Sequence, residues 1–186
     1  MDPLKRLWQQ GLRIVLHPGD FFSELAEKEE LAGDVLRQHL VYTASIPALA
    51  IFVGDAIVGQ EGVLQPAFPT LLRAALYFVL TLAHVYLAAE LLVWLGSYFR
   101  LLPDFNRAFA LLAYCLTPSF VAGGFQVVPA LRPFSLFALY SLYLAYTYAP
   151  RVFRVPPSDR GAFGLVVLLA VVGVWAALSM AFSLVA

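Results

Sequence analysis

The sequence predicts an all-α, polytopic membrane protein: a bundle of five transmembrane helices preceded by short amphipathic N-terminal helices. Hydrophobic residues make up 61% of the 186 residues and charged residues only 13%, whereas an ordinary soluble domain is about 25% charged. The hydrophobic residues also gather in five stretches, each close to the roughly 20 residues that a helix needs to cross a bilayer. A chain this short folding in water could not hide so much apolar surface.

Residues 1–37 form the only extended polar region and are expected to be a cytoplasmic amphipathic segment. Its first sixteen residues separate into two helical faces, an apolar one with Leu4, Leu7, Trp8, Leu12 and Val15 and a polar one with Lys5, Arg6, Gln9, Gln10 and Arg13. Such a helix either lies in a headgroup layer or packs on the end of the bundle, and the sequence favours neither. His17, Pro18 and Gly19 are expected to break it, and Asp20 to cap a second helix that ends near Lys28.

Residues 38–186 are expected to form the transmembrane domain. Short connectors containing Gly, Pro or charged residues separate its five predicted helices, which cover about residues 38–58, 70–98, 105–123, 133–149 and 162–184. The segments are apolar on all sides and do not alternate, which favours helices over the strands of a membrane barrel. The second is long enough to tilt or to extend past the bilayer, and the fourth is rich in tyrosine.

The placement of Lys and Arg predicts how the bundle is oriented in the cell membrane, because cytoplasmic loops carry the excess of positive charge. With the N-terminus inside, only Arg73 and Arg132 fall on the far side. The other ten are cytoplasmic: Lys5, Arg6, Arg13, Lys28, Arg37, Arg100, Arg107, Arg151, Arg154 and Arg160. The sequence therefore predicts a multi-pass protein of the cell inner membrane with its N-terminus cytoplasmic and its C-terminus on the opposite side.

Two ionisable residues, His84 and Glu90, fall inside the second apolar segment, where such side chains are costly and usually face the bundle interior. They are six positions apart, so they point in different directions on one helix. Residues of neighbouring helices would complete a candidate intramembrane polar site, which comprises His84, Glu90, Arg107, Tyr114 and Tyr143. The sequence leaves open whether these side chains are sealed among helices or line a path.

Three further residues are expected to be structural. Asp55 and Arg73 lie near facing ends of the first two segments, so we expect them to form an ion pair close to water. Pro118, in the third segment, removes a backbone hydrogen bond and predicts a helix kink.

No residues have the spacing of a zinc site, a nucleophile elbow, a phosphate-binding loop or paired catalytic carboxylates. We therefore expect no catalytic residue, no metal and no cofactor. The net charge of zero gives no reason to expect a nucleic acid partner.

A family resemblance follows from the order of several aromatic and proline motifs. Pro18, Asp20, Phe21 and Phe22 come first; the stretch 109–114 then leads to Pro118, and the stretch 140–148 leads to Pro150, Val155, Pro156 and Arg160. From about Leu16 onwards, this order resembles the Yip-domain family, which comprises the Ypt/Rab-interacting membrane proteins and their prokaryotic relatives. The resemblance implies a five-helix membrane domain with a cytoplasmic N-terminus. The short N-terminal region is more similar to the short prokaryotic members than to the eukaryotic ones, which are associated with prenylated small GTPases and with organising secretory membranes.

Two functions are expected from these observations. The first is a non-enzymatic membrane-organising, scaffold or trafficking-type protein, whose partners are the lipid bilayer and either other membrane proteins or a second copy in a homo-oligomer. The alternative is a small transporter or channel, in which Glu90 and His84 line a polar path and Pro118 is a hinge. An intramembrane enzyme ranks lowest, because no two groups have a spacing that enforces acid–base or metal chemistry.

Overall fold

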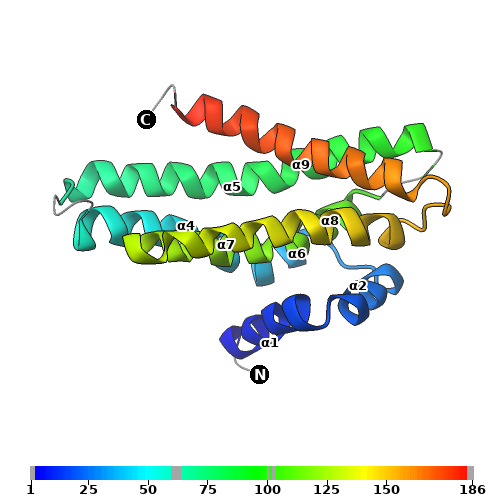
Figure 1. Ribbon diagram of the computed structural model, residues 1–186, viewed down its shortest axis with the longest axis horizontal. Coiled ribbons are helices and arrows are strands. Elements are labelled where there is room, and N and C mark those ends of the chain that lie inside the picture. The colour runs from blue at the N-terminus through cyan, green and yellow to red at the C-terminus, as the bar shows by residue number, and fades with distance from the viewer. Residues whose placement is uncertain (1–2, 60–63, 100, 102–103, 184–186) are drawn as a thin grey trace.

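The computed structural model describes residues 3–59, 64–99, 101 and 104–183, and these are almost entirely helical, with no strand among them. The long helices run side by side along the longest axis of the molecule, and two short N-terminal helices lie against one flank (Figure 1). The prediction of an all-α fold is confirmed.

The N-terminal region forms two helices, α1 (Pro3–Leu16) and α2 (Pro18–Glu27). They are separated by His17 alone, and Pro18 opens α2, since proline fits a first helical turn whose N–H groups have no helical partner. Asp20 therefore lies within the first turn, and the prediction that it caps the helix was wrong.

Among the residues that the structure describes, three helical stretches are long and apolar enough to cross a membrane: Ala32–Val58, Ala67–Phe99 and Arg160–Met180. The first runs through α3 (Ala32–Val35), the π-helical η1 (Leu36–Leu40), α4 (Val41–Val53) and the π-helical η2 (Gly54–Val58). The second is α5 (Ala67–Gly96) with one 3₁₀ turn, η3 (Ser97–Phe99), and the third lies within α9 (Arg160–Ser183).

The two remaining apolar segments are interrupted helices. One is α6 (Phe105–Cys115) followed by α7 (Thr117–Gly124); the other is the 3₁₀ helix η5 (Pro129–Ala138) followed by α8 (Leu139–Val152), and the short η4 (Phe125–Val127) connects them. Two residues before Pro118, where a kink is predicted, Leu116 separates α6 from α7, and we call this interruption the break at Leu116. Ser141 of α8 supports the break, because its hydroxyl accepts the N–H of Ser119 at 2.8 Å.

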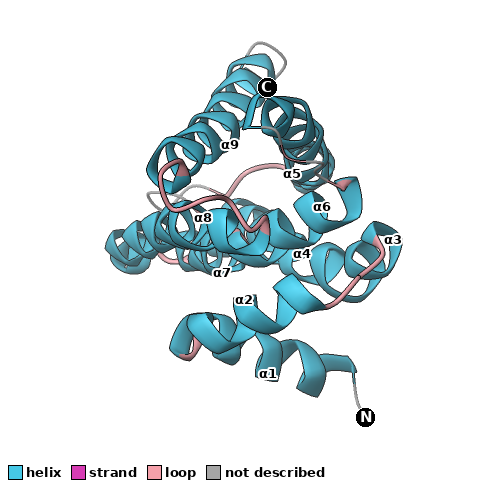
Figure 2. Ribbon diagram, turned by 90° about the vertical axis from the view of Figure 1, so that its right-hand side faces the viewer, coloured by secondary structure: helices cyan, strands magenta, loops and turns pink. Residues whose placement is uncertain are grey.

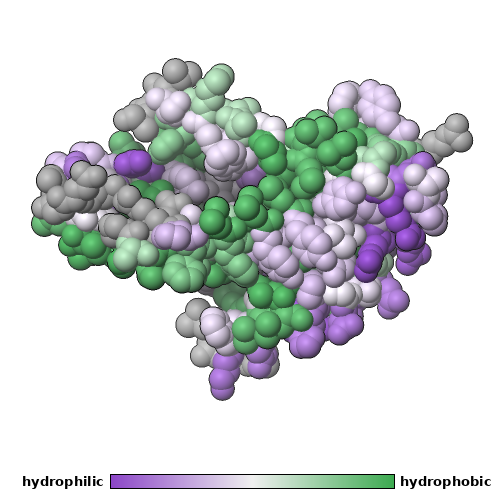
Figure 3. All heavy atoms as spheres, viewed as in Figure 1, coloured by the Kyte–Doolittle hydropathy of each residue, from purple (hydrophilic) through white to green (hydrophobic). Residues whose placement is uncertain are grey.

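The helices pack around α6, in which every side chain from Ala108 to Cys115 is buried. Figure 2 shows α5 and α9 together on one side, α4, α7 and α8 on the other, and α1 and α2 beyond that second group. Apolar residues cover most of the visible surface of the bundle, and polar residues gather at the end where the chain passes from α8 to α9 (Figure 3). We call this the polar end.

A helix stop at the polar end uses an unusual backbone conformation. Arg154 has a φ of 55°, and the N–H groups of Val155 and Arg154 donate to the carbonyls of Pro150 at 2.8 Å and Arg151 at 3.0 Å. This is the Schellman pattern, which satisfies the last carbonyls of α8. It turns the chain toward α9 and leaves Arg151 and Arg154 exposed.

Glycines set two close helix contacts. A Cβ atom at Gly164 of α9 would lie 2.8 Å from the backbone oxygen of Tyr146 in α8, and one at Gly123 of α7 would lie 2.6 Å from Cβ of Pro47 in α4. Small residues allow such close approach between helices in membranes. Gly173, also in α9, would meet nothing within 4 Å.

We expect Gly164→Ala to destabilise the bundle, because the new methyl group would lie 2.8 Å from both the ring and the backbone oxygen of Tyr146, and the backbone oxygen cannot turn away. Overpacking of this kind costs about 1–3 kcal/mol. Thermal unfolding of the detergent-solubilised protein measures the effect, and Gly173→Ala in the same helix is the matched control. Equal midpoints for the two variants would contradict the close contact between α8 and α9.

Candidate functional site at the polar end

Tyrosines of the bundle hold α2 in place. Phe22, which is almost fully buried, stacks on Tyr148 of α8 with ring centroids 4.8 Å apart. Phe21 meets Tyr114 of α6 edge to face at 5.0 Å. Aromatic pairs contribute about 0.5–1.5 kcal/mol each beyond the burial of their area. The tyrosine-rich fourth segment thus packs against the N-terminal helices, a role that the sequence did not indicate.

The end of α1 is held by one buried side chain and two polar contacts. Ile14 is fully buried, and the hydroxyl of Tyr140 donates to the carbonyl of Val15 at 3.2 Å. Arg13 also forms an exposed ion pair with Glu24 of α2. The hydrogen bond from Arg13 lowers the pKa of Glu24 below its ordinary value, and Lys28, 3.4 Å from the same carboxylate, acts in the same direction.

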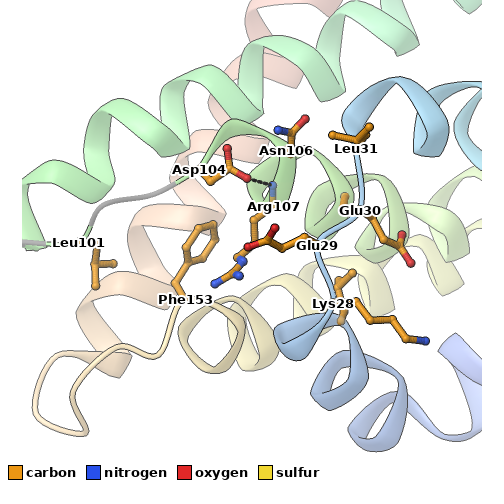
Figure 4. Close-up of a pocket in the computed structure, with 11 residues that line it drawn as sticks. Lys28, Glu29, Glu30, Leu31, Leu101, Asp104, Asn106, Arg107 and Phe153 are labelled. Atoms are coloured by element: carbon orange, nitrogen blue, oxygen red, sulfur yellow. Dashed lines mark hydrogen bonds between the residues drawn. The ribbon is translucent and has the colours of Figure 1, made fainter.

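The segment Lys28–Leu31, which joins α2 to α3, lies between two polar hollows. The larger has a volume of about 430 Å³ and lies on the side of α6 (Figure 4), so we call it the α6 hollow. Figure 4 shows Glu29 and Arg107 extending into the same space and Lys28 turned away from it. The Asn106 side chain accepts the N–H of Ala32 at 2.9 Å, which ties the start of α3 to α6.

The smaller hollow has a volume of about 310 Å³ and opens beside α1, so we call it the α1 hollow. The polar residues that line it include Gln10, Glu29, Glu30, Asp34, His39 and Tyr114. The Tyr114 hydroxyl donates to Glu30 at 2.7 Å, so the tyrosine that packs on Phe21 also fixes one carboxylate of this hollow.

His39 is one of the residues that border the α1 hollow, and only 1% of its surface is exposed. Its Nε2 lies 2.8 Å from the hydroxyl oxygen of Thr117, and that hydroxyl donates to the carbonyl of Ala113 at 3.1 Å. We therefore assign the proton to Nε2, which leaves Nδ1 as an acceptor. Among the described residues, Nδ1 of His39 is the one buried side-chain nitrogen or oxygen without a hydrogen-bond partner.

Sequence reasoning missed His39 as a site residue. The available signal was an ionisable residue near the start of the first apolar segment, which is uncommon in membrane helices and usually functional. In the structure, His39 also lies in the π-helical turn Leu36–Leu40, and such turns are frequent at functional sites.

The five residues of the predicted intramembrane site are not brought together. His84 is buried and its Nε2 lies 3.0 Å from the carbonyl oxygen of Val171, so it joins α5 to α9. Glu90 is exposed on α5, on the same face as Tyr86 and Trp94, which are four positions before and after it and are also exposed. The expectation that Glu90 faces the bundle interior is therefore corrected.

The other three predicted residues lie apart from this pair. Arg107 lines the α6 hollow, Tyr114 lines the α1 hollow, and Tyr143 is 54% exposed on α8. A cavity of about 120 Å³ does contain His84, but Glu90 is not part of its lining. The polar path through Glu90 and His84, on which the transport hypothesis depended, is thus without structural support in the described residues.

The ion pair expected between Asp55 and Arg73, at the end of the bundle opposite the polar end, is present. Nη1 of Arg73 lies 3.3 Å from Oδ2 of Asp55, whose side chain is only 6% exposed. Within the described ranges, no three or more His, Cys, Asp or Glu side chains are grouped so that they could hold a metal ion.

We expect Tyr148→Leu to loosen α1 and α2, because it removes the ring on which Phe22 stacks. Hydrogen–deuterium exchange on the protein in nanodiscs measures this as faster exchange of the amides of residues 18–27, with exchange in α9 unchanged. Tyr143→Leu, an exposed position on the same helix, is the control. Similar exchange rates in the two variants would show that the stacked pair does not hold α2.

Comparison with known proteins gives one match. The model of the Yip1 domain family matches residues 12–180, which includes nearly all residues of both hollows, and it confirms the resemblance drawn from the sequence. Neither a curated protein nor a solved structure matches the chain.

Proposed function

Because the chain belongs to the Yip1 domain family, we propose that it is a non-enzymatic protein that organises, or serves as a scaffold in, the bilayer it spans. One observation carries the proposal: the apolar face of α1 is left uncovered by the bundle. Trp8, Leu12 and Leu16 recur at every fourth position and are 70%, 40% and 64% exposed, whereas Ile14 on another face of α1 is buried.

An uncovered face of this kind suits the boundary between headgroups and acyl chains. Amphipathic helices with basic polar faces insert their apolar side there to a shallow depth, and tryptophan is enriched at that level. Lys5, Gln9 and Arg13 are exposed on α1 beside its apolar residues. Since tyrosines fix α1 and α2 to the bundle, a force on α1 would be transmitted to the spanning helices.

The proposal counts five membrane crossings. Two are added to the three long apolar stretches: the interrupted helix of residues 105–124 and that of residues 129–152. Both run alongside the long helices (Figure 1), and α6 is buried among them. Five crossings and the asymmetry in Lys and Arg then give a cytoplasmic N-terminus and a C-terminus on the other face of the inner membrane. Arg100, one of the ten cytoplasmic residues, lies outside the described residues.

Cysteine labelling tests the number of crossings. In a Cys115→Ser background, we expect Val128→Cys to react with an impermeant maleimide added outside intact cells, and Ser158→Cys to react only after permeabilisation. Both positions are exposed. If residues 105–152 instead entered and left on one side, both cysteines would label from the inside, and the count of five would be wrong.

Vesicle remodelling tests the function. We expect the reconstituted protein to shift vesicles toward smaller diameters or tubules in electron micrographs, and Trp8→Gln/Leu12→Gln to reduce the remodelled fraction several-fold. Phe68→Gln/Leu72→Gln is the matched control, because it also removes two exposed apolar side chains four positions apart, at the opposite end of the bundle.

Tryptophan quenching separates the position of α1 from its effect on vesicles. With Trp94→Phe and Trp175→Phe, Trp8 is the only one of the three tryptophans left. Quenching by lipids brominated near the headgroup is expected. If such lipids do not quench Trp8, or if the Trp8→Gln/Leu12→Gln variant remodels vesicles as well as the wild type, the proposal fails.

A further inference from the structure

The cavity that contains His84 lies between the spanning helices and away from the polar end. It has a volume of about 120 Å³ and lies where α5 and α9 run together (Figure 2), and residues of α4 and α7 complete its wall. We call it the bundle cavity. Most of its lining is apolar, and the polar members are Tyr77, Thr81, His84, Ser119 and Ser179.

His84 presents a hydrogen-bond acceptor to this cavity. Its Nε2 lies 3.0 Å from the carbonyl oxygen of Val171, which can only accept, so Nε2 carries the proton and Nδ1 of the neutral ring is an acceptor. A charged ring would be costly here, because His84 lies near the middle of the spanning stretch Ala67–Phe99.

This acceptor is unpaired and open to the cavity. In the described part of the chain, Nδ1 of His84 has no hydrogen-bond partner, and Nδ1 of His39 is the one unpaired side-chain nitrogen or oxygen that is fully sealed. Nδ1 of His84 therefore keeps accessible surface, although the residue as a whole is only 7% exposed. That surface borders the cavity that the residue lines.

Three hydroxyl groups of the same lining are also unpaired. Those of Tyr77, Ser119 and Ser179 have no hydrogen-bond partner among the residues that the structure describes. By contrast, Ser45 and Ser183, also in spanning helices, donate to carbonyls of their own helices at 2.7 and 2.8 Å. Because polar groups at membrane depth are almost always paired, four unpaired ones around one cavity call for a ligand that forms hydrogen bonds.

The size and the apolar lining of the cavity define the rest of the ligand. A cavity of about 150 Å³ holds one benzene molecule, so 120 Å³ holds a group of about six carbon atoms. No charged residue lines the cavity in the described ranges, so a neutral ligand is favoured. Trp175 in the wall is 56% exposed on α9, so the cavity reaches the surface of the bundle that faces lipid.

From these observations we propose that the bundle cavity binds the hydroxyl end of a neutral amphiphile, which is either a small alcohol dissolved in the bilayer or a neutral lipid such as a diacylglycerol. The ligand donates its O–H to Nδ1 of His84, and its oxygen accepts from the hydroxyl of Ser119 or Ser179. Its apolar part packs on the apolar lining and extends into the bilayer beside Trp175. An ether has no O–H and would leave Nδ1 unpaired, so the site discriminates alcohols from ethers.

Solid-state NMR of the full-length protein, labelled with ¹⁵N-histidine, tests the chemistry of the site. Phosphatidylcholine liposomes are used, because this lipid has neither O–H nor N–H groups. We expect hexan-1-ol to move the Nδ1 resonance of His84 upfield, the direction in which a hydrogen bond moves an imidazole acceptor. Its isomer methyl pentyl ether is expected to leave the resonance in place. The sealed Nδ1 of His39 is the internal control.

Variants assign the resonance and locate the effect in the cavity. The signal of His84, one of three histidines, is the one lost in His84→Gln. Ser179→Leu is expected to fill the cavity and to abolish the shift, and Ser183→Leu, four positions along the same helix and outside the lining, is the control.

A second pair of variants tests the serine hydroxyls. Ser119→Ala/Ser179→Ala is expected to weaken the binding of hexan-1-ol several-fold, as measured by titrating the Nδ1 shift, because a hydrogen bond to the ligand is lost. Ser45→Ala/Ser183→Ala is the matched control, since those hydroxyls are bonded within their own helices and do not line the cavity.

Dioleoylglycerol separates the two sources of the hydroxyl group. If dioleoylglycerol in the liposomes shifts the Nδ1 resonance and its methyl ether does not, the source is a neutral lipid. A shift with hexan-1-ol alone identifies a small alcohol, and either result supports the site.

Several results would overturn the proposal. These are no shift with either alcohol, an equal shift with the ethers, a shift that persists in Ser179→Leu, or full affinity in Ser119→Ala/Ser179→Ala. An Nδ1 resonance that is at the hydrogen-bonded position before any alcohol is added, and that no alcohol changes, would show that water fills the cavity and would also overturn it.

Discussion

The packing of α2 on tyrosines of the bundle is the contact on which the rest of the polar end depends. The Phe22–Tyr148 stack and the Phe21–Tyr114 contact fix α2, and α2 in turn fixes the direction of α1 and the path of the segment Lys28–Leu31. Tyrosine suits this position because its ring packs as an apolar group while its hydroxyl bonds a polar partner. Tyr114 does both, since it packs on Phe21 and donates to Glu30.

Much of the fold could be predicted because a membrane allows few alternatives. Backbone groups in lipid must be hydrogen-bonded within the chain, so five apolar stretches predict helices before any packing is known. The residues at which the helices begin and end were harder to predict. The first long helix begins at Ala32, earlier than hydropathy suggested, because Asp34 and Arg37 on its exposed side lower the average over its first turns. The break at Leu116 depends on Ser141, a residue from another helix, which no local pattern reveals.

The candidate site was harder to predict because hydropathy gives the depth of a residue and not the direction in which it points. The second segment is apolar all round, so nothing in it distinguishes the face of His84 from that of Glu90, and only packing places one inside and the other outside. Tyr114 was expected in an intramembrane site with His84 and Glu90, whereas it borders the α1 hollow. Its partner Glu30 lies 84 positions earlier in the chain, in the polar N-terminal segment.

Two irregularities in the helices meet at the α1 hollow and explain its position. The π-helical turn Leu36–Leu40 carries His39, and the break at Leu116 precedes Thr117, the residue to which His39 is hydrogen-bonded. The ring centroids of Tyr114 and His39 are 4.7 Å apart, and Tyr114 also packs on Phe21. The tyrosine that holds α2 therefore also borders the hollow. Because α2 sets the direction of α1, the shape of the hollow and the position of the exposed apolar face of α1 depend on one shared side chain.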